Sequence, residues 1–141
     1  MDWTSSIQTI VAVIGFGAVV YQLSQVERSV RSATRSNIYD LAARVKQNII
    51  DNPELRPYFH ESKKITANDK NYDKVMAVAD LFCLYLENIA TQGEGVSKEN
   101  RRAWGEYIRD KYESCPAIKM HLKSNESSYS EEFWKILNNE A

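Results

Sequence analysis

The chain has 141 residues, of which 43% are hydrophobic and 26% are charged, and its formal net charge at pH 7 is −1. This length accommodates one globular domain with a short additional segment and excludes two domains of ordinary size. Because 18 basic residues nearly balance 19 acidic ones, the overall field is weak and we expect no nucleic-acid partner. Cys83 and Cys115 form no CxxC pair and belong to no His/Cys cluster, so we expect no disulfide framework, metal site or cofactor.

An uncharged stretch near the N-terminus, IQTIVAVIGFGAVVYQL, occupies Ile7–Leu23. Extended back to Thr4, it forms a helix of about 30 Å at roughly 1.5 Å per residue, which matches the hydrocarbon core of a bilayer. Trp3 and Tyr21 lie near its two ends, where aromatic rings prefer the membrane interface. We therefore predict a transmembrane anchor over residues 1–23. An acidic flank and the lack of a cleavage site argue against a signal peptide, whereas a buried core helix remains the alternative.

Basic residues lie only after this stretch. The five nearest are Arg28, Arg31, Arg35, Arg44 and Lys46. Because such residues are retained on the cytoplasmic side, we predict an outer N-terminus and a cytoplasmic C-terminal domain with free thiols. Arg28, Arg31 and Arg35 form a flank at the inner leaflet, where anionic headgroups contribute about 1 kcal/mol for each arginine. The topology rule alone explains these arginines equally well.

Small residues form a low patch within the predicted span. Gly15, Gly17 and Ala18 would let a second helix approach closely in the membrane, although their spacing is not GxxxG. Ordinary lipid-facing composition is the alternative interpretation.

Residues 24–51 are predicted to continue the membrane helix as a juxtamembrane stalk, because no Pro or Gly interrupts them. Apolar residues recur at helical spacing through this segment as far as Ile49. The first members alternate in steps of three and four: Leu23, Val26, Val30, Ala33 and Asn37. Two interpretations stay open, namely packing on the later helices of the same chain and parallel self-association, in which Asn37 fixes the register.

The sequence NPELRPYF predicts a structural corner at the start of a helical domain over residues 52–141. Asn52 is expected to cap a turn that begins at Pro53, and Glu54 complements its positive end. Arg56 precedes Pro57 and is expected outside the helical region. Three apolar side chains anchor the corner: Leu55, Tyr58 and Phe59.

The rest of the chain is predicted to be helical, which makes the fold all-α. A polar loop over 62–71 precedes the central core helix, which begins at Asn71 or Tyr72 and ends near Thr91. A helix over 97–114 follows, with a buried stripe predicted at Trp104, Tyr107, Ile108 and Tyr112. Pro116 begins a short helix, and Ser130 caps the last one.

Two carboxylates lie on the apolar central helix. Asp80 and Glu87 are seven residues apart, so we expect them either to form buried ion pairs or to reach the edge of the apolar face. The candidate partners are Arg101, Arg102 and Arg109 on the next helix. Paired carboxylates can act as general acid and base, but no nucleophile, partner histidine or oxyanion site accompanies them. We therefore expect no enzymatic activity. His60 stands beside Glu61 without a second ligand and is expected to be exposed.

The order of these segments resembles a broad group of uncharacterised bacterial single-span proteins. The resemblance covers nearly the whole chain and rests on VYQLSQVERSVRSATRSNIY, NPELRPYF, LYLENIA, a Trp-bearing helix and SCPAIK. It implies a bacterial inner-membrane location and an all-helical cytoplasmic domain, with no activity and no catalytic residue to carry over.

Together these patterns predict a membrane-anchored interaction or sensing module whose partners are the lipid bilayer, an unidentified protein and, through self-association, a second copy. The alternative is a ligand-triggered membrane effector, for example in antiphage defence, that acts through oligomerised transmembrane helices. A third hypothesis is a membrane-tethered hydrolase that uses Asp80, Glu87 or His60.

Overall fold

The computed structural model describes the backbone of residues 3–92 and 98–140, and the side chains of residues 15–92 and 100–140. Within these ranges the chain forms helices and turns without a strand, so the all-α prediction is confirmed. The chain divides into two compact units, Met1–Ser36 and Asn37–Ala141. The boundary falls inside the predicted stalk.

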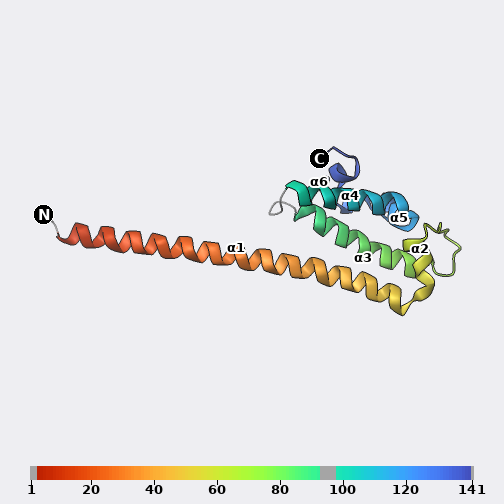
Figure 1. Cartoon of the computed structure of the whole chain (residues 1–141), viewed down its shortest axis with the longest axis horizontal. Helices are drawn as coiled ribbons and strands as arrows, with labels where there is room; N and C mark the ends of the chain where they lie inside the picture. Colours follow the sequence, from red (N-terminus) through yellow and green to blue (C-terminus); the bar gives the residue numbers. More distant parts are fainter. Residues whose placement is uncertain (1–2, 93–97, 141) are drawn as a thin grey trace. The chain divides into compact units, whose positions relative to one another are not determined.

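Helix α1 comprises Trp3–Asp51 and continues unbroken from one unit into the other (Figure 1). The predicted continuous helix is thus confirmed over residues 3–51, and its exposed surface carries ion pairs one turn apart, Arg31 with Glu27 and Arg44 with Asp40. Among the side chains that the structure describes, we find no helix with a window apolar and long enough to cross a bilayer. The predicted span includes residues 4–14, whose side chains lie outside the described part.

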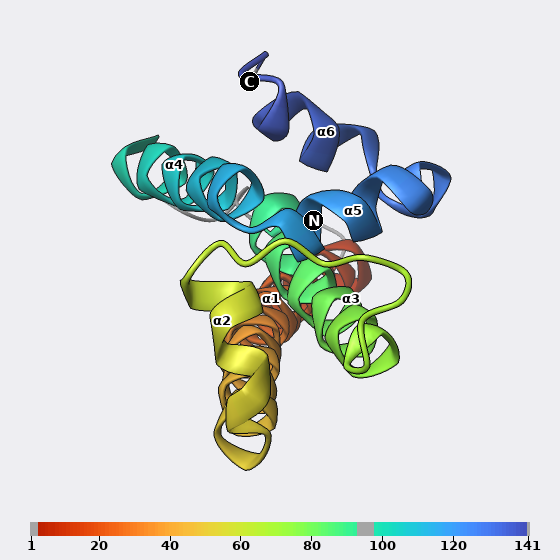
Figure 2. The same cartoon turned by 90° about the vertical axis from the view of Figure 1, so that its right-hand side faces the viewer.

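The second unit begins with the last fifteen residues of α1. The 3-10 turn η1 (Pro53–Leu55) and the short helix α2 (Arg56–His60) follow directly, and a loop leads to α3 (Tyr72–Thr91). The remaining elements are α4 (Lys98–Ser114), α5 (Pro116–Ser124), the 3-10 turn η3 (Glu126–Ser128) and α6 (Glu131–Leu137). Helix α3 is central, because α4, α5 and α6 all pack against it (Figure 2).

The predicted corner differs from expectation at two residues. Arg56 is helical, with φ −51° and ψ −43°, because it continues the turn begun at Pro53 and because Pro57 falls in the first turn, where it removes no helical hydrogen bond. The side chain of Asn52 donates to the carbonyl of Asn48 at 3.0 Å instead of capping the new turn. The three apolar side chains that were predicted to anchor the corner are all buried: Leu55, Tyr58 and Phe59.

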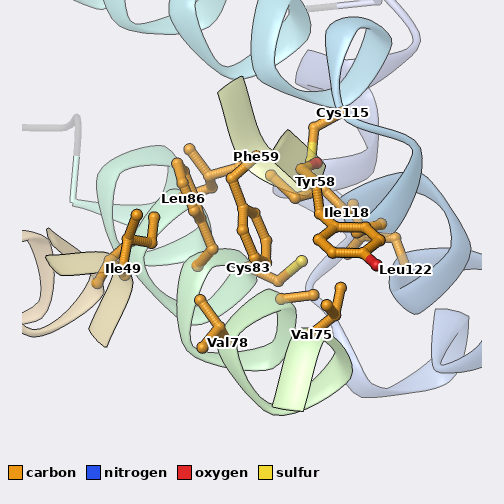
Figure 3. Packing of buried hydrophobic residues seen from close by; sticks show 14 of the residues in the cluster. Ile49, Tyr58, Phe59, Val75, Val78, Cys83, Leu86, Cys115, Ile118 and Leu122 are labelled. Carbon is orange, nitrogen blue, oxygen red and sulfur yellow. The ribbon is translucent and has the colours of Figure 1, made fainter. Parts of the chain in front are cut away.

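A single hydrophobic core fills the second unit. Figure 3 shows Tyr58 and Phe59 of α2 projecting into the space lined by α3 and α5, with Ile49 of α1 on the far side of α3. The buried face of α3 follows helical spacing and comprises Val75, Val78, Ala79, Phe82, Cys83, Leu86 and Ile89. The corner, α3 and α5 therefore share one hydrophobic core.

Helix α4 buries less than predicted. Ile108 is fully buried, but Trp104 is 41% exposed, so its place in the buried stripe was wrong. Gly105 is the buried residue of that turn, where a Cβ atom would lie 3.7 Å from the Ile136 side chain and 3.5 Å from Arg109. Helix α6 therefore approaches α4 most closely at Gly105, and the Trp104 ring stays partly exposed to solvent.

Candidate functional site

The most unusual surface of the molecule lies on α1 in the first unit. Five large hydrophobic side chains are exposed there within eight residues: Phe16, Val19, Val20, Tyr21 and Leu23. Because successive residues of a helix are rotated by about 100°, four of these side chains share one face, and Tyr21 lies on the opposite side beside Gly17 and Ala18, so no charged residue interrupts the circumference. A helix that is apolar all round normally lies in a protein interior or in lipid. We call residues 15–23 the apolar collar.

The predicted small-residue patch lies in this collar. A Cβ atom added at Gly15 or at Gly17 would meet no other atom within 4 Å, and Ala18 is exposed. The backbone next to these residues is thus open to any partner helix or to lipid. No described contact within the chain requires glycine at either position.

The predicted basic flank follows the collar. Arg28, Arg31 and Arg35 are all exposed, and Arg31 is paired with Glu27 on the same helix. At about 100° per residue, the three arginines occupy one side of α1, opposite the exposed Val26 and Val30. This segment therefore has a basic face and an apolar face.

Tyr58 of the corner is the centre of a hydrogen-bonded cluster with Lys63, Asp69 and Cys115, which we call the lock. The Tyr58 hydroxyl donates to Asp69 at 2.6 Å and accepts from Lys63 at 2.7 Å, while the Cys115 thiol donates to the Tyr58 carbonyl at 3.2 Å. The hydrogen bond from Tyr58 lowers the pKa of Asp69 and the one to Tyr58 raises the pKa of Lys63. Tyr58 is buried, so these contacts tie the loop over 61–71 to the core.

The two carboxylates of α3 take partners other than Arg109. Asp80 is exposed and lies 3.1 Å from Nε2 of His121, while Glu87 accepts a hydrogen bond from the backbone N–H of Ser130 at 2.8 Å. Arg109 donates to the carbonyl of Ile136 at 3.2 Å. The predicted pairing with Arg109 was therefore wrong. Helices α5 and α6 bring a histidine and a helix N-terminus to the two carboxylates, and both favour negative charge.

His121 is the buried polar residue that sequence reasoning missed. Its Nε2 also lies 3.0 Å from the Tyr129 hydroxyl, and its side chain is 11% exposed. The pattern of α5 could have indicated this burial, because His121 follows Ile118 by three residues and precedes Leu122 on the same apolar face. Asp80, His121 and Tyr129 thus form a polar cluster at the edge of the hydrophobic core.

This polar cluster contains no activated nucleophile. Burial raises the pKa of the nearby Cys83 thiol, so the thiol stays protonated at neutral pH. His60, the other histidine, is exposed at the end of α2. Among the described residues, no three His, Cys, Asp or Glu side chains come together in a way that could hold a metal ion.

A scan of protein-family models and searches of curated proteins and of solved structures found no match to this chain. The features of the molecule that bear on its function are the exposed surface of α1 and the closed core of the second unit.

Proposed function

We propose that this protein is a membrane-anchored interaction or sensing module, in which the N-terminal part of α1 spans a bilayer and the helical unit after it binds a partner protein. The apolar collar is the observation that carries the proposal. Exposed apolar surface of this extent, on a stretch of helix without a charged residue, is costly in water and favourable in hydrocarbon. The sequence before the collar is also uncharged back to Trp3, which brings the uncharged stretch to the length of a span.

The arginines after the collar support an orientation. Arg28, Arg31 and Arg35 are exposed within two turns of α1 and no Lys or Arg precedes the collar. This asymmetry favours a cytoplasmic second unit in a bacterial inner membrane. Protease protection tests it: a tag at the C-terminus should be digested from the cytoplasmic side, whereas digestion of an N-terminal tag from that side would reverse the orientation.

The second unit supports binding in preference to catalysis. Its carboxylates, histidine and tyrosines serve as partners for one another, for a helix N-terminus or for a loop, and its thiols are buried. Exposed side chains such as Trp104 and Leu84 give a protein partner apolar contacts at its surface. Crosslinking followed by purification of the full chain should recover a defined partner, and recovery of none would contradict this half of the proposal.

Extraction of membranes with alkaline carbonate tests the anchor. The full chain should stay in the membrane pellet and leave it only with detergent. Two charges within the collar, Phe16→Asp with Val20→Asp, should release it, because aspartate inside a span is unfavourable, by about 3 kcal/mol near the centre and by less toward the end. The matched control, Ser32→Asp with Ser36→Asp, has the same spacing below the collar and should remain in the pellet. A wild-type chain in the aqueous supernatant would refute the anchor.

The membrane-effector alternative uses the same collar differently, through spans that assemble and permeabilise the bilayer. Leakage of a trapped dye from vesicles that contain the full chain distinguishes the two functions. An anchored module leaves the vesicles intact, and an effector releases the dye.

A further inference from the structure

The exposed apolar residues of the first unit follow one regular pattern. Starting at Phe16, steps of three and four residues alternate through seven positions: Phe16, Val19, Leu23, Val26, Val30, Ala33 and Asn37. The five large hydrophobic members are between 51% and 72% exposed. We call these seven residues the seam. Its average step of 3.5 residues is the repeat of a coiled coil.

The seam has the length and composition of a two-stranded interface. It extends over three heptads, with Phe16, Leu23, Val30 and Asn37 at position a, and with Val19, Val26 and Ala33 at position d. A strict 3.5-residue repeat drifts by about 20° per heptad around a straight helix, so two such helices keep contact by a left-handed supercoil. Helix α1 is continuous over all seven positions.

The seam ends where the second unit begins. The next two positions of the pattern are Asp40 and Arg44, which are exposed and paired with each other at 2.8 Å. The residues of α1 that enter the hydrophobic core, Val45 and Ile49, do not belong to the seam register. The seam and the core-facing residues are thus two separate apolar patterns on one helix.

Charges are placed where a second copy of α1 would not be repelled. Arg28 and Arg35 occupy position f and Arg31 occupies position b, all on the outer side of a coiled coil. The flanking e and g positions from Gln22 to Ser36 contain one charged residue, Glu27, and Arg31 of the same helix neutralises it. Two parallel copies therefore bring no like charges together at the seam.

Asn37 favours the parallel direction. In parallel register it faces Asn37 of the second copy, and paired asparagines at position a select two parallel strands. An antiparallel pairing would place it against Phe16 and leave a polar amide without a polar neighbour. Within one chain, Asn37 Nδ2 donates to Asn88 at 3.5 Å, and the same amide has a second N–H and an oxygen to offer.

We infer that residues 16–37 of α1 form a parallel two-stranded coiled coil with a second copy of this chain, which joins the membrane helix to the stalk as one interface. The inference rests on the proposed function in one respect, because anchoring in a shared membrane aligns the two chains and raises their effective concentration. The predicted patch of Gly15, Gly17 and Ala18 lies at positions g, b and c. The partner therefore contacts the large residues, with only Gly15 beside them.

Disulfide crosslinking in membranes containing the full chain tests the inference. Val26→Cys and Ala33→Cys each place a thiol at a d position, opposite its own copy in a parallel coil, whereas the neighbours Gln25→Cys and Ser32→Cys point outward at c. Under mild oxidation, we expect about tenfold more disulfide-linked dimer at the d positions than at their neighbours, since a disulfide needs Cβ atoms about 4 Å apart. The unsubstituted chain, with Cys83 and Cys115 buried, is the background.

Each result has one meaning. Equal crosslinking at d and c positions, or none at either, overturns the coiled coil. Crosslinking at only one of Val26→Cys and Ala33→Cys also overturns it, because an antiparallel pair cannot place both residues opposite their own copies. Carbonate extraction of the same samples keeps the anchor separate. Dimer in the supernatant would refute the anchor and uphold the seam, whereas monomer in the pellet would do the reverse.

Discussion

Val26 and Val45 have the same side chain and lie on the same helix, yet Val26 is 58% exposed and Val45 is 4% exposed. Val45 belongs to the unit Asn37–Ala141, where α3 and its neighbours bury most of the large apolar residues wholly or in part. Val26 belongs to the unit Met1–Ser36, where the described apolar residues have no such cover. The comparison teaches that helical periodicity identifies an apolar face, while the surroundings decide whether that face belongs to a core or to an external contact.

The largest expected difference between the units comes from deleting a leucine side chain. Leu86→Ala removes a fully buried residue of α3 and should lower the free energy of unfolding by about 2–5 kcal/mol, because it leaves a cavity. Leu23→Ala makes the same chemical change at a residue that is 64% exposed and should leave unfolding of the second unit unchanged. Urea unfolding in detergent, followed by near-ultraviolet circular dichroism, measures both. A similar loss in the two variants would contradict the division.

A smaller effect is expected from removing one hydroxyl in the lock. Tyr58→Phe should cost about 1–2 kcal/mol, since the buried ring loses its hydrogen bonds to the loop. Tyr39→Phe, at an exposed tyrosine of α1, is the matched control and should cost nothing measurable.

The loss of stability caused by Tyr58→Phe should depend on pH. The folded state lowers the pKa of Asp69, mainly through the Tyr58 hydrogen bond, so the stability linked to this carboxylate is present above its unfolded pKa and is lost as the pH falls through the lower folded value. The difference in the free energy of unfolding between the wild type and Tyr58→Phe should therefore begin to shrink as the pH falls below about 3.8, the ordinary pKa of aspartate. A difference that persists unchanged at lower pH would rule out this contact as its source.

Glu87→Ala should cost about 1 kcal/mol, because the carboxylate caps the backbone N–H of Ser130 at the start of α6. Glu106→Ala removes a glutamate whose exposed ion pair with Arg102 lies on the surface of α4, and should cost less than about 0.5 kcal/mol. Thermal unfolding midpoints of the two variants give the comparison. Equal shifts would show that the cap contributes no more than a surface pair.

The smallest effect concerns the two thiols and appears only at alkaline pH. Burial raises the pKa of Cys83 and of Cys115 above their ordinary value of 9.0. The folded state therefore keeps protons that the unfolded state releases, and stability should decline as the pH rises above about 9. At pH 8, both thiols should react with iodoacetamide only after unfolding, and fast alkylation of the native chain would contradict their burial.

Local rules predicted much of the second unit. The helices at 72–91 and 116–124 and the cap at Ser130 are confirmed, because apolar periodicity, Pro116 and a serine before two glutamates determine them within a few residues. The predicted start of α4 at Ser97 lies outside the described residues. Strong local patterns are thus sufficient to specify these elements.

The errors lie where distant elements meet. The partners of Asp80 and Glu87 depend on how α5 and α6 approach α3, and Trp104 is exposed because α6 approaches at Gly105. Sequence spacing does not specify these distances. The membrane span, the orientation and the self-association of α1 remain predictions, since their partners are lipid or another chain.

Accessibility of the collar to a water-soluble maleimide tests the central claim most directly. In membranes containing the full chain, Gly17→Cys and Ala18→Cys should react at least about tenfold more slowly than Arg31→Cys and Ser32→Cys, because lipid excludes the reagent from the first pair only. These pairs are fourteen residues apart and share the outer positions b and c, so the coiled coil shields them equally. Full denaturation in urea and sodium dodecyl sulfate should equalise the rates, whereas equal rates in the intact membranes would show that the collar is in water and contradict the account.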